Sequence, residues 1–434
     1  MFNPREAALN SLVKWDSSAS FSNIELNTVI SRQKAEKNDN SLYTLLFLGV
    51  IEKKMLLDSI IDEYSQIPPS KIEIQTKNIL RLGIYQLLFT DKIPEYSAVS
   101  ESVNLANKRS KGFVNAVLRS FIRAGKKYSL PNEKWERISL ENSIPMDIIN
   151  IFRSSYGDDI ATELCTLPPQ KSHISLRINT LRTSVDEVIA ILLKKDYIAE
   201  KSSLARDIVI TNAPISALED ILDNGYAFVQ DESSRIASEV FGAQAGEVVA
   251  DVCACPGGKS FSIALDMQNK GELYSSDLHQ NKLSLIEKGA KRLGVDIINT
   301  RAQNAKELVP EYLEKFDRVL CDVPCSGLGV IFKKPDIKYK PIDNINALPS
   351  VQYDILINCA KYVKKGGILV YSTCTINSLE NEKNIEKFLL ENPSFEAVDF
   401  EIGEIKSNKG GYTFLPCKIA TDGFFVAKMR RKDD

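Results

Sequence analysis

Residues 248–260 have the sequence V-V-A-D-V-C-A-C-P-G-G-K-S, in which an apolar run leads into a Pro-Gly-Gly turn. The run predicts a buried strand, and the turn predicts that a helix starts directly after it. Gly257 and Gly258 would let backbone N–H groups approach a ligand closely at the N-terminus of that helix. The stretch therefore predicts a strand-to-helix ligand site in an α/β domain.

The alternation of strand and helix continues from about residue 236 to the end of the chain. Candidate strands lie at 247–252, 272–276, 295–300, 317–321, 367–371 and 423–428. Such alternation predicts a doubly wound, Rossmann-like α/β sheet with helices on both faces. We expect residues 236–434 to form this domain.

The residues before this domain predict two further parts. Residues 1–130 are expected to form an all-α bundle, because apolar residues recur at helical spacing from Ala8 to Trp15 and again over 113–122. A helix start is expected at Asn3-Pro4. Residues 131–235 predict linker helices followed by a small α/β domain, with strands at 174–178, 208–211 and 226–229 and helices at 184–193 and 215–222.

Composition excludes several classes of protein. The 434 residues carry a net charge of −2, which excludes a globally basic nucleic-acid binder but not a local basic patch. Two histidines and the absence of a C-x-x-C motif argue against a zinc site and a histidine-based hydrolase. The eight cysteines fit a reduced compartment. With no signal region and no apolar run of about 20 residues, we expect a cytoplasmic protein that does not contact the membrane.

Two cysteines directly follow predicted strands. D-V-P-C-S-G at 322–327 follows the strand at 317–321, and Y-S-T-C-T at 371–375 follows the strand at 367–371. The carboxyl ends of parallel strands meet at one edge of a sheet, so we expect Cys325, Cys374 and Asp322 to lie there together. The other cysteines are interpreted as packing residues, buried at Cys165, Cys321, Cys359 and Cys417 and beside the turn at Cys253 and Cys255.

Two thiols beside a carboxylate suit nucleophilic attack on carbon. A thiolate adds readily to an electron-poor carbon such as C6 of a pyrimidine. Addition at C6 of cytosine makes C5 enamine-like, so that C5 can accept a methyl group, and Asp322 could stabilise the adduct at the N3/N4 edge. One cysteine would attack and the other would assist release. The residues alone do not rank Cys325 and Cys374 for these two roles.

The turn and the next strand predict an adenosine-bearing cofactor. Asp277 ends that strand, at the position where an acidic residue hydrogen-bonds a ribose in dinucleotide and adenosyl folds. Gly258-Lys259-Ser260 also invites a phosphate-binding P-loop interpretation. That loop needs glycine at position 253, where this chain has Cys253, so a nucleotide-phosphate site is the weaker alternative.

Several motifs together resemble a known family. They are C-A-C-P-G-G-K (253–259), D-V-P-C-S-G-L-G-V (322–330), K-P-D-I-K-Y (334–339), Y-S-T-C-T (371–375) and T-D-G-F-F-V-A-K (421–428). In this order and spacing they resemble the motifs of the RNA 5-methylcytosine methyltransferases, the NOL1/NOP2/Sun family. Residues 1–130, with V-N-A-V-L-R at 114–119, resemble a NusB-like RNA-binding bundle. The combination resembles the branch of the family that methylates 16S (small-subunit) rRNA.

The resemblance implies S-adenosyl-L-methionine as cofactor. Its site would be Cys253, Ala254, Cys255, Pro256, Gly257, Gly258 and Lys259, with carboxylates at Asp277 and Asp322. Asn304 stands where the family usually has an aspartate that contacts the adenine end, which predicts weaker cofactor binding because a charged acceptor becomes neutral. The family assigns the nucleophile to Cys374 and product release to Cys325. The expected partner is 16S rRNA or an early small-subunit particle, and a monomer is expected.

Two basic clusters predict contact with RNA. Lys108, Arg109 and Lys111 lie in a basic stretch at 101–130. A second cluster consists of Lys333, Lys334, Lys338 and Lys340, interleaved with Phe332 and Tyr339. Lysine and arginine neutralise phosphates, and aromatic rings stack on unpaired bases. The target cytosine must be unpaired or flipped from its stack.

Two alternatives stay open at this point. The substrate could be a cytosine of tRNA or of 23S rRNA. The chain could also be an RNA-binding ribosome assembly factor with an idle catalytic domain, which the presence of Cys325, Cys374 and Asp322 disfavours.

Overall fold

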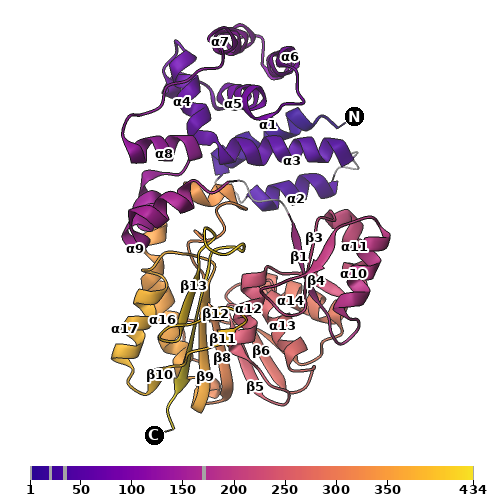
Figure 1. Ribbon diagram of the computed structural model, residues 1–434, viewed down its shortest axis with the longest axis vertical. Helices are drawn as coiled ribbons and strands as arrows, with labels where there is room; N and C mark the ends of the chain where they lie inside the picture. Colours follow the sequence, from indigo (N-terminus) through magenta and orange to yellow (C-terminus); the bar gives the residue numbers. More distant parts are fainter. Residues whose placement is uncertain (1, 19–21, 33–36, 169–172, 434) are drawn as a thin grey trace. The chain divides into compact units, whose positions relative to one another are not determined.

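The computed structural model describes residues 2–18, 22–32, 37–168 and 173–433 (Figure 1). The chain divides into two compact units. The helical unit comprises Met1–Leu167 and Ile331–Lys340, and the sheet unit comprises Pro168–Val330 and Pro341–Asp434. Among the described residues, no helix is both long and apolar enough to cross a membrane. The sequence-based boundaries at 130 and 235 stay predictions.

The helical unit confirms the all-α prediction for the N-terminal residues. Its elements are α1 (Pro4–Ser18), α2 (Ser22–Arg32), α3 (Lys37–Glu52), α4 (Lys54–Tyr64), η1 (Pro69–Lys71), α5 (Ile74–Phe89), α6 (Glu95–Leu105), α7 (Lys111–Arg123), α8 (Lys134–Asn142), α9 (Met146–Cys165) and η3 (Pro335–Tyr339). The side chain of Asn3 caps α1 by accepting from the N–H groups of Arg5 and Glu6. The apolar faces of α1, α3, α4, α5, α6 and α7 form one core, in which Phe47 and Phe121 are fully buried.

A buried arginine ties three of these helices together. The guanidinium of Arg81 in α5 donates to both carboxylate oxygens of Asp58 in α4, at 2.6 and 2.8 Å, and to Asp16 in α1 at 2.6 Å. Burial alone would raise the pKa of Asp58, but the hydrogen bonds and charge of Arg81 outweigh burial and lower it. The cluster therefore holds a charged carboxylate against the core of the bundle.

Residues 331–340 belong to the helical unit, which corrects part of the RNA-contact prediction. Lys338 is buried and donates to the carbonyl oxygens of Glu52 at 3.1 Å and Asn142 at 3.4 Å. The ring of Tyr339 packs edge-on against Trp15 at 5.7 Å. The prediction that Lys338 and Tyr339 are available to RNA is therefore wrong, because both side chains pack against the helices of this unit.

The sheet unit begins with a small antiparallel sheet in the order β2-β3-β1-β4. Its strands are β1 (Ile174–Ile178), β2 (Ala199–Lys201), β3 (Ile208–Thr211) and β4 (Ala227–Val229), and its helices are α10 (Val185–Lys194) and α11 (Ile215–Asp223). Ser184 and Glu187 form a capping box at the start of α10. The apolar faces of both helices pack on this sheet, so the predicted small α/β domain is confirmed. Strand β2 was not expected from the sequence.

The second sheet has the order β10-β14-β9-β8-β5-β6-β7, with β13 paired to β14. Its strands are β5 (Val248–Val252), β6 (Glu272–Asp277), β7 (Ile298–Ala302), β8 (Phe316–Asp322), β9 (Val363–Thr373), β10 (Phe395–Ala397), β13 (Gly411–Phe414) and β14 (Phe424–Arg431). Strands β5 to β9 are parallel, whereas β14 runs antiparallel to β9. The remaining elements of this unit are α12 (Glu232–Phe241), α13 (Gly258–Asp266), α14 (Gln280–Leu293), η2 (Pro310–Tyr312), α15 (Ile342–Asn346), α16 (Leu348–Ala360), α17 (Glu382–Glu391), β11 (Glu401–Ile402) and β12 (Ile405–Lys406).

Helices cover both faces of this sheet, as the sequence predicts. Leu320 and Val370 pack with α12, α13 and α14, whereas their neighbours Val319 and Leu369 pack with α16 and α17. Successive side chains of a strand point to opposite faces, so an uninterrupted apolar run fills two cores. The Rossmann-like fold class is confirmed.

Candidate active site

The structure places the two predicted thiols side by side. Cys325 follows β8 and Cys374 follows β9, and these adjacent strands pair Asp322 with Ser372 near their carboxyl ends. The two Sγ atoms lie 3.1 Å apart. A hydrogen bond to Cys374, burial and nearby negative charge raise the pKa of the Cys325 thiol well above its ordinary value. Cys325 therefore keeps its proton at neutral pH.

Asp322 is held beside the thiols by two donors. The Lys259 ammonium donates to Oδ2 of Asp322 at 2.8 Å, and the Ser372 hydroxyl donates to Oδ1 at 2.8 Å. Burial alone would lower the pKa of Lys259, but the attraction of Asp322 outweighs burial and raises it. Lys259, which follows the glycine turn, and Asp322, which ends β8, thus form an ion pair. Neither the C-A-C-P-G-G-K motif nor the D-V-P-C-S-G motif predicts this contact by itself.

A buried carboxylate clamps the two cysteine loops. Glu380 is fully buried and accepts hydrogen bonds from the backbone N–H of Ser326 at 2.9 Å, from Gln352 at 2.8 Å and from the side chain of Asn377 at 3.0 Å. The hydroxyls of Ser326 and Thr375, the residues directly after the two cysteines, are 2.7 Å apart. Sequence reasoning missed this clamp, because Glu380 follows no strand and stands in no chemistry-bearing pattern.

Two glycines allow a third loop to approach the same cysteines. The N–H of Gly329 donates to the carbonyl oxygen of Cys374 at 3.1 Å, and the N–H of Gly423 donates to the carbonyl oxygen of Gly329 at 2.9 Å. A Cβ atom on Gly329 would lie 1.9 Å from the Gly423 carbonyl oxygen, so no larger residue fits. The close approach of the two loops explains why the D-V-P-C-S-G-L-G-V and T-D-G-F-F motifs each contain a glycine at this contact.

The predicted cofactor turn lies between β5 and α13. Gly257 precedes α13 with φ +112°, a left-handed conformation that favours glycine. Asp277 lies at the end of β6, where its carboxylate accepts from the backbone N–H groups of Cys255 at 3.3 Å and His279 at 3.1 Å. Burial and the nearby Asp277 charge raise the pKa of Cys255 to about 12. The structure thus brings the turn and Asp277 together.

Asn304 is engaged in its own loop. Its amide nitrogen donates to Glu307 at 2.9 Å, and its amide oxygen accepts from the backbone N–H of Lys306 at 3.1 Å. An aspartate at this position would place two carboxylates in contact. Asn304 and Glu307 therefore form a matched pair.

Asp251 is a functional candidate that the sequence analysis missed. It is fully buried at the carboxyl half of β5; its Oδ2 accepts from the Ser260 hydroxyl at 2.5 Å, and within the described chain its Oδ1 has no hydrogen-bond partner. Burial raises its pKa to about 7. An unpartnered carboxylate oxygen is costly to bury, which indicates a ligand that supplies a donor.

The other cysteines and the basic residues occupy other places. Cys165, Cys321 and Cys359 are buried as predicted, but Cys417 is only partly buried, because the 415–418 turn after β13 lies near the surface. The part of the chain that the structure describes contains no group of His, Cys, Asp or Glu side chains suited to a metal ion. The predicted RNA-contacting residues are exposed and belong to the helical unit: Lys108, Arg109, Lys111, Lys333 and Lys334.

Comparison with known proteins agrees with this architecture. Three family models match the chain: the NusB family over residues 2–123, an RsmF/B-like ferredoxin-like domain over 144–217, and the 16S rRNA methyltransferase RsmB/F over 239–430. "Probable ribosomal RNA small subunit methyltransferase B" of Bacillus subtilis (strain 168) is 36% identical and covers 99% of this chain and 98% of its own. The chain belongs to the RsmB/F methyltransferase family.

Other relatives of this RsmB/F-family chain support the assignment. Ribosomal RNA small subunit methyltransferase B of Klebsiella pneumoniae (strain 342) is 31% identical, over 92% of both chains. The crystal structure of PH0851 has a TM-score of 0.83 and 26% identity, and covers 99% of both chains. A methyltransferase homolog protein from Pyrococcus horikoshii has a TM-score of 0.59 and 26% identity, and covers 68% of this chain and 97% of its own. The resemblance predicted from the motifs is confirmed.

Proposed function

We propose that this protein methylates C5 of a cytosine in 16S rRNA, using S-adenosyl-L-methionine and a covalent bond between Cys374 and C6 of the base. The observation that carries the proposal is the pair of thiols, 3.1 Å apart beside the Asp322–Lys259 ion pair. Membership of the RsmB/F family supports rRNA as the substrate class.

The residues around the glycine turn fit S-adenosyl-L-methionine. The unpartnered Oδ1 of Asp251 suits the ammonium of the amino-acid part, and Asp277 at the end of β6 suits the ribose hydroxyls. Gly257 and Gly258 leave the start of α13 without side chains, so that backbone can approach the ligand closely. When bound, the cofactor supplies an electrophilic methyl group.

Cys374 performs the attack. The two Sγ atoms lie within hydrogen-bond distance, and the Cys325 thiol, whose pKa is raised, can act as the donor to a thiolate at Cys374. The Cys374 sulfur forms a bond to C6, and the electron pair of the C5–C6 double bond moves toward C5 and the N3 edge. Asp322 accepts from the exocyclic amine, and the Lys259 ammonium beside it stabilises the negative charge that develops on the ring.

Release reverses the first step. After C5 has taken the methyl group, a water molecule accepts the C5 proton. The electron pair of the C5–H bond forms the C5–C6 double bond again, and the electron pair of the C6–sulfur bond stays on the sulfur of Cys374. The Cys325 thiol hydrogen-bonds the departing sulfur of Cys374 and so stabilises it as a leaving group. This geometry supports the division of roles that the family resemblance implies.

The test is methyl transfer from labelled S-adenosyl-L-methionine to protein-free 16S rRNA and to early small-subunit particles, with the site mapped by bisulfite sequencing. We expect label at one cytosine, abolished in Cys374→Ala. In Cys325→Ala we expect a protein–RNA adduct that survives denaturing electrophoresis. Label only on tRNA or 23S rRNA would replace the substrate. Absence of label on all these RNAs, together with RNA binding, would favour the idle assembly factor.

A further inference from the structure

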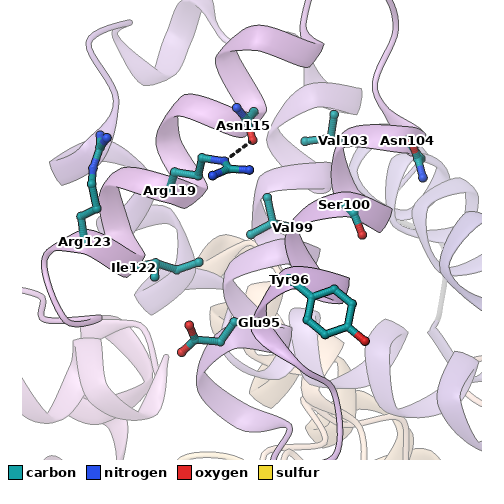
Figure 2. Close-up of a pocket in the computed structure, with 10 residues that line it drawn as sticks. All are labelled: Glu95, Tyr96, Val99, Ser100, Val103, Asn104, Asn115, Arg119, Ile122 and Arg123. Carbon is teal, nitrogen blue, oxygen red and sulfur yellow. Dashed lines mark hydrogen bonds between the residues drawn. The ribbon is translucent and has the colours of Figure 1, made fainter.

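A pocket of about 500 Å³ lies on the helical unit between α6 and α7 (Figure 2). It is lined by Glu95, Tyr96, Val99, Ser100, Val103 and Asn104 of α6 and by Asn115, Arg119, Ile122 and Arg123 of α7. None of these residues takes part in the active site described above. A cavity of this size accommodates a ligand as large as a nucleotide.

The floor of the pocket is apolar, and an aromatic ring stands at its edge. Val99 is buried, and Val103 and Ile122 are half-buried. Tyr96, one turn before Val99 on the same face of α6, keeps 77% of its surface exposed. Figure 2 shows Val99 between Tyr96 on one side and Arg119 on the other. A large exposed ring beside an apolar floor is unusual for a helix face whose only role is packing.

The rim of the pocket is positively charged. Arg119 donates to the amide oxygen of Asn115 at 2.8 Å, and Arg123 donates to the Ser120 hydroxyl at 3.0 Å. Within the described residues, neither guanidinium forms an ion pair with a carboxylate. The one acidic lining residue, Glu95, is neutralised by Lys126 at 2.9 Å. Two guanidinium groups without a carboxylate partner favour an anionic ligand.

We infer that this pocket binds an unpaired nucleotide of the RNA substrate, away from the target cytosine. The base would lie on Tyr96 and the apolar floor, with the amides of Asn104 and Asn115 at its edge. A phosphate would accept hydrogen bonds from the guanidinium groups of Arg119 and Arg123. The inference rests on the proposed function only in taking RNA as the substrate.

The surroundings of the pocket favour RNA over an acidic peptide. Exposed basic residues extend this charge: Lys111 is the first residue of α7, Arg109 precedes the helix and Lys127 follows it. The 13 residues of α7 span about 20 Å, which matches several nucleotides of a single strand rather than one carboxylate. A ring and two guanidinium groups around an apolar floor combine stacking with phosphate binding, the pair of interactions by which proteins hold unpaired strands.

The experiment measures binding of a fluorescein-labelled oligouridine of about 12 nucleotides to the full-length protein by anisotropy. The variants are Tyr96→Ala, Tyr96→Phe and the double variant Arg119→Glu/Arg123→Glu. Lys71→Glu is the control, because Lys71 is exposed and lies in η1 outside the pocket. Circular dichroism of each variant verifies that the bundle is folded.

We expect Tyr96→Ala to weaken binding about 5- to 150-fold, the range for loss of one stacked base, and Tyr96→Phe to keep the affinity. The double arginine variant should reduce the slope of log affinity against log salt by about 0.7, because both guanidinium groups bind one phosphate and each single-strand phosphate contact contributes about 0.7. Lys71→Glu should change the affinity by less than about twofold. The matching duplex should bind independently of Tyr96, because its bases cannot stack on a side chain.

Three results would overturn the inference: unchanged oligouridine affinity in folded Tyr96→Ala and double arginine variants, equal loss in Lys71→Glu, or equally tight competition by polyglutamate of the same charge. The last result would identify an acidic-peptide site.

Methyl transfer by the same variants separates this inference from the proposed function. If the wild type methylates cytosine and the pocket variants keep its KM for RNA, only the inference fails. If oligouridine binding depends on the pocket but no cytosine is methylated, only the proposed function fails.

Discussion

Replacement of Glu380 by glutamine tests whether the buried clamp positions the two thiols. Glu380 accepts three hydrogen bonds, from the backbone N–H of Ser326 and the side chains of Gln352 and Asn377. An amide oxygen can still accept from two of these donors, but the amide nitrogen must face the third. The donors that share Oε2, the N–H of Ser326 and the side chain of Gln352, would then bind a neutral acceptor, so the connection between the loops of Cys325 and Cys374 would weaken.

The magnitude follows from the hydrogen bonds. An unsatisfied buried donor costs about 1–3 kcal/mol, and exchanging a charged acceptor for a neutral one costs about 1 kcal/mol for each of the two remaining bonds. Glu380→Gln should thus lower the free energy of unfolding by about 3–5 kcal/mol. Misplacement of a reacting group by about 1 Å can reduce a rate about 100-fold. We expect kcat to fall by this factor while KM for RNA and for S-adenosyl-L-methionine changes less than about threefold.

The assay combines steady-state methyl transfer with urea unfolding. Glu247→Gln is the matched control, because Glu247 also accepts three hydrogen bonds, two from Arg318 and one from the N–H of Gln244, at the opposite end of β5. The control should lose stability and keep kcat. If Glu380→Gln matches Glu247→Gln in both quantities, the clamp does not position the thiols. Gln352→Ala, which removes one donor, provides a milder variant if Glu380→Gln fails to fold.

Three further predictions concern charge. Lys259→Met should lower kcat at least tenfold, since it removes the partner of Asp322. The pKa of Lys259 is raised in the folded protein, so the ion pair stabilises the protein at neutral pH and this stability is lost above about pH 10.5. Urea unfolding of the variant should therefore lack this loss of stability at alkaline pH. Asp251 has a folded pKa raised from 3.8 to about 7, so it binds more protons when folded, and ligand-free stability should fall as pH rises through this range. Asp251→Asn should remove that slope in urea unfolding at pH 5 and 8, and should weaken S-adenosyl-L-methionine binding in calorimetry at least tenfold; an unchanged slope would contradict the assignment. Arg81→Met should destabilise the helical unit by about 3–5 kcal/mol, because Asp58 and Asp16 would keep buried charges without their partner. A change below about 1 kcal/mol in thermal unfolding would refute that estimate.

Local patterns in the sequence predict the central strands and their helices. The stretches at 248–252 and 317–321 became β5 and β8, because a strand buried on both faces needs apolar residues on both sides and most positions of these stretches are apolar. The short strands β10 and β13 were missed, since each has few residues and exposes part of its surface. Their pairing with β14 at the edge of the sheet, rather than a local preference, decides their conformation.

The chemistry of the site was predictable where it follows strand ends. Both thiols, Asp322 and Asp277 lie at the carboxyl ends of parallel strands, so their shared edge follows from the α/β pattern. The prediction for Tyr339 was wrong, because its surroundings are set by Trp15, more than 300 residues away in the chain. A run of alternating basic and aromatic residues looks the same whether its rings face solvent or a core.

By itself, the sequence determined the fold class, the family motifs and the identity of the candidate thiols, since each rests on residues close together in the chain. Only the tertiary structure decided that Lys259 pairs with Asp322, that Asp251 keeps an unpartnered oxygen, and that Glu380 joins the two cysteine loops. These contacts join residues from separate elements. Hydrogen bonds depend on distances of about 3 Å, and such distances arise only when strands and helices have packed into one sheet.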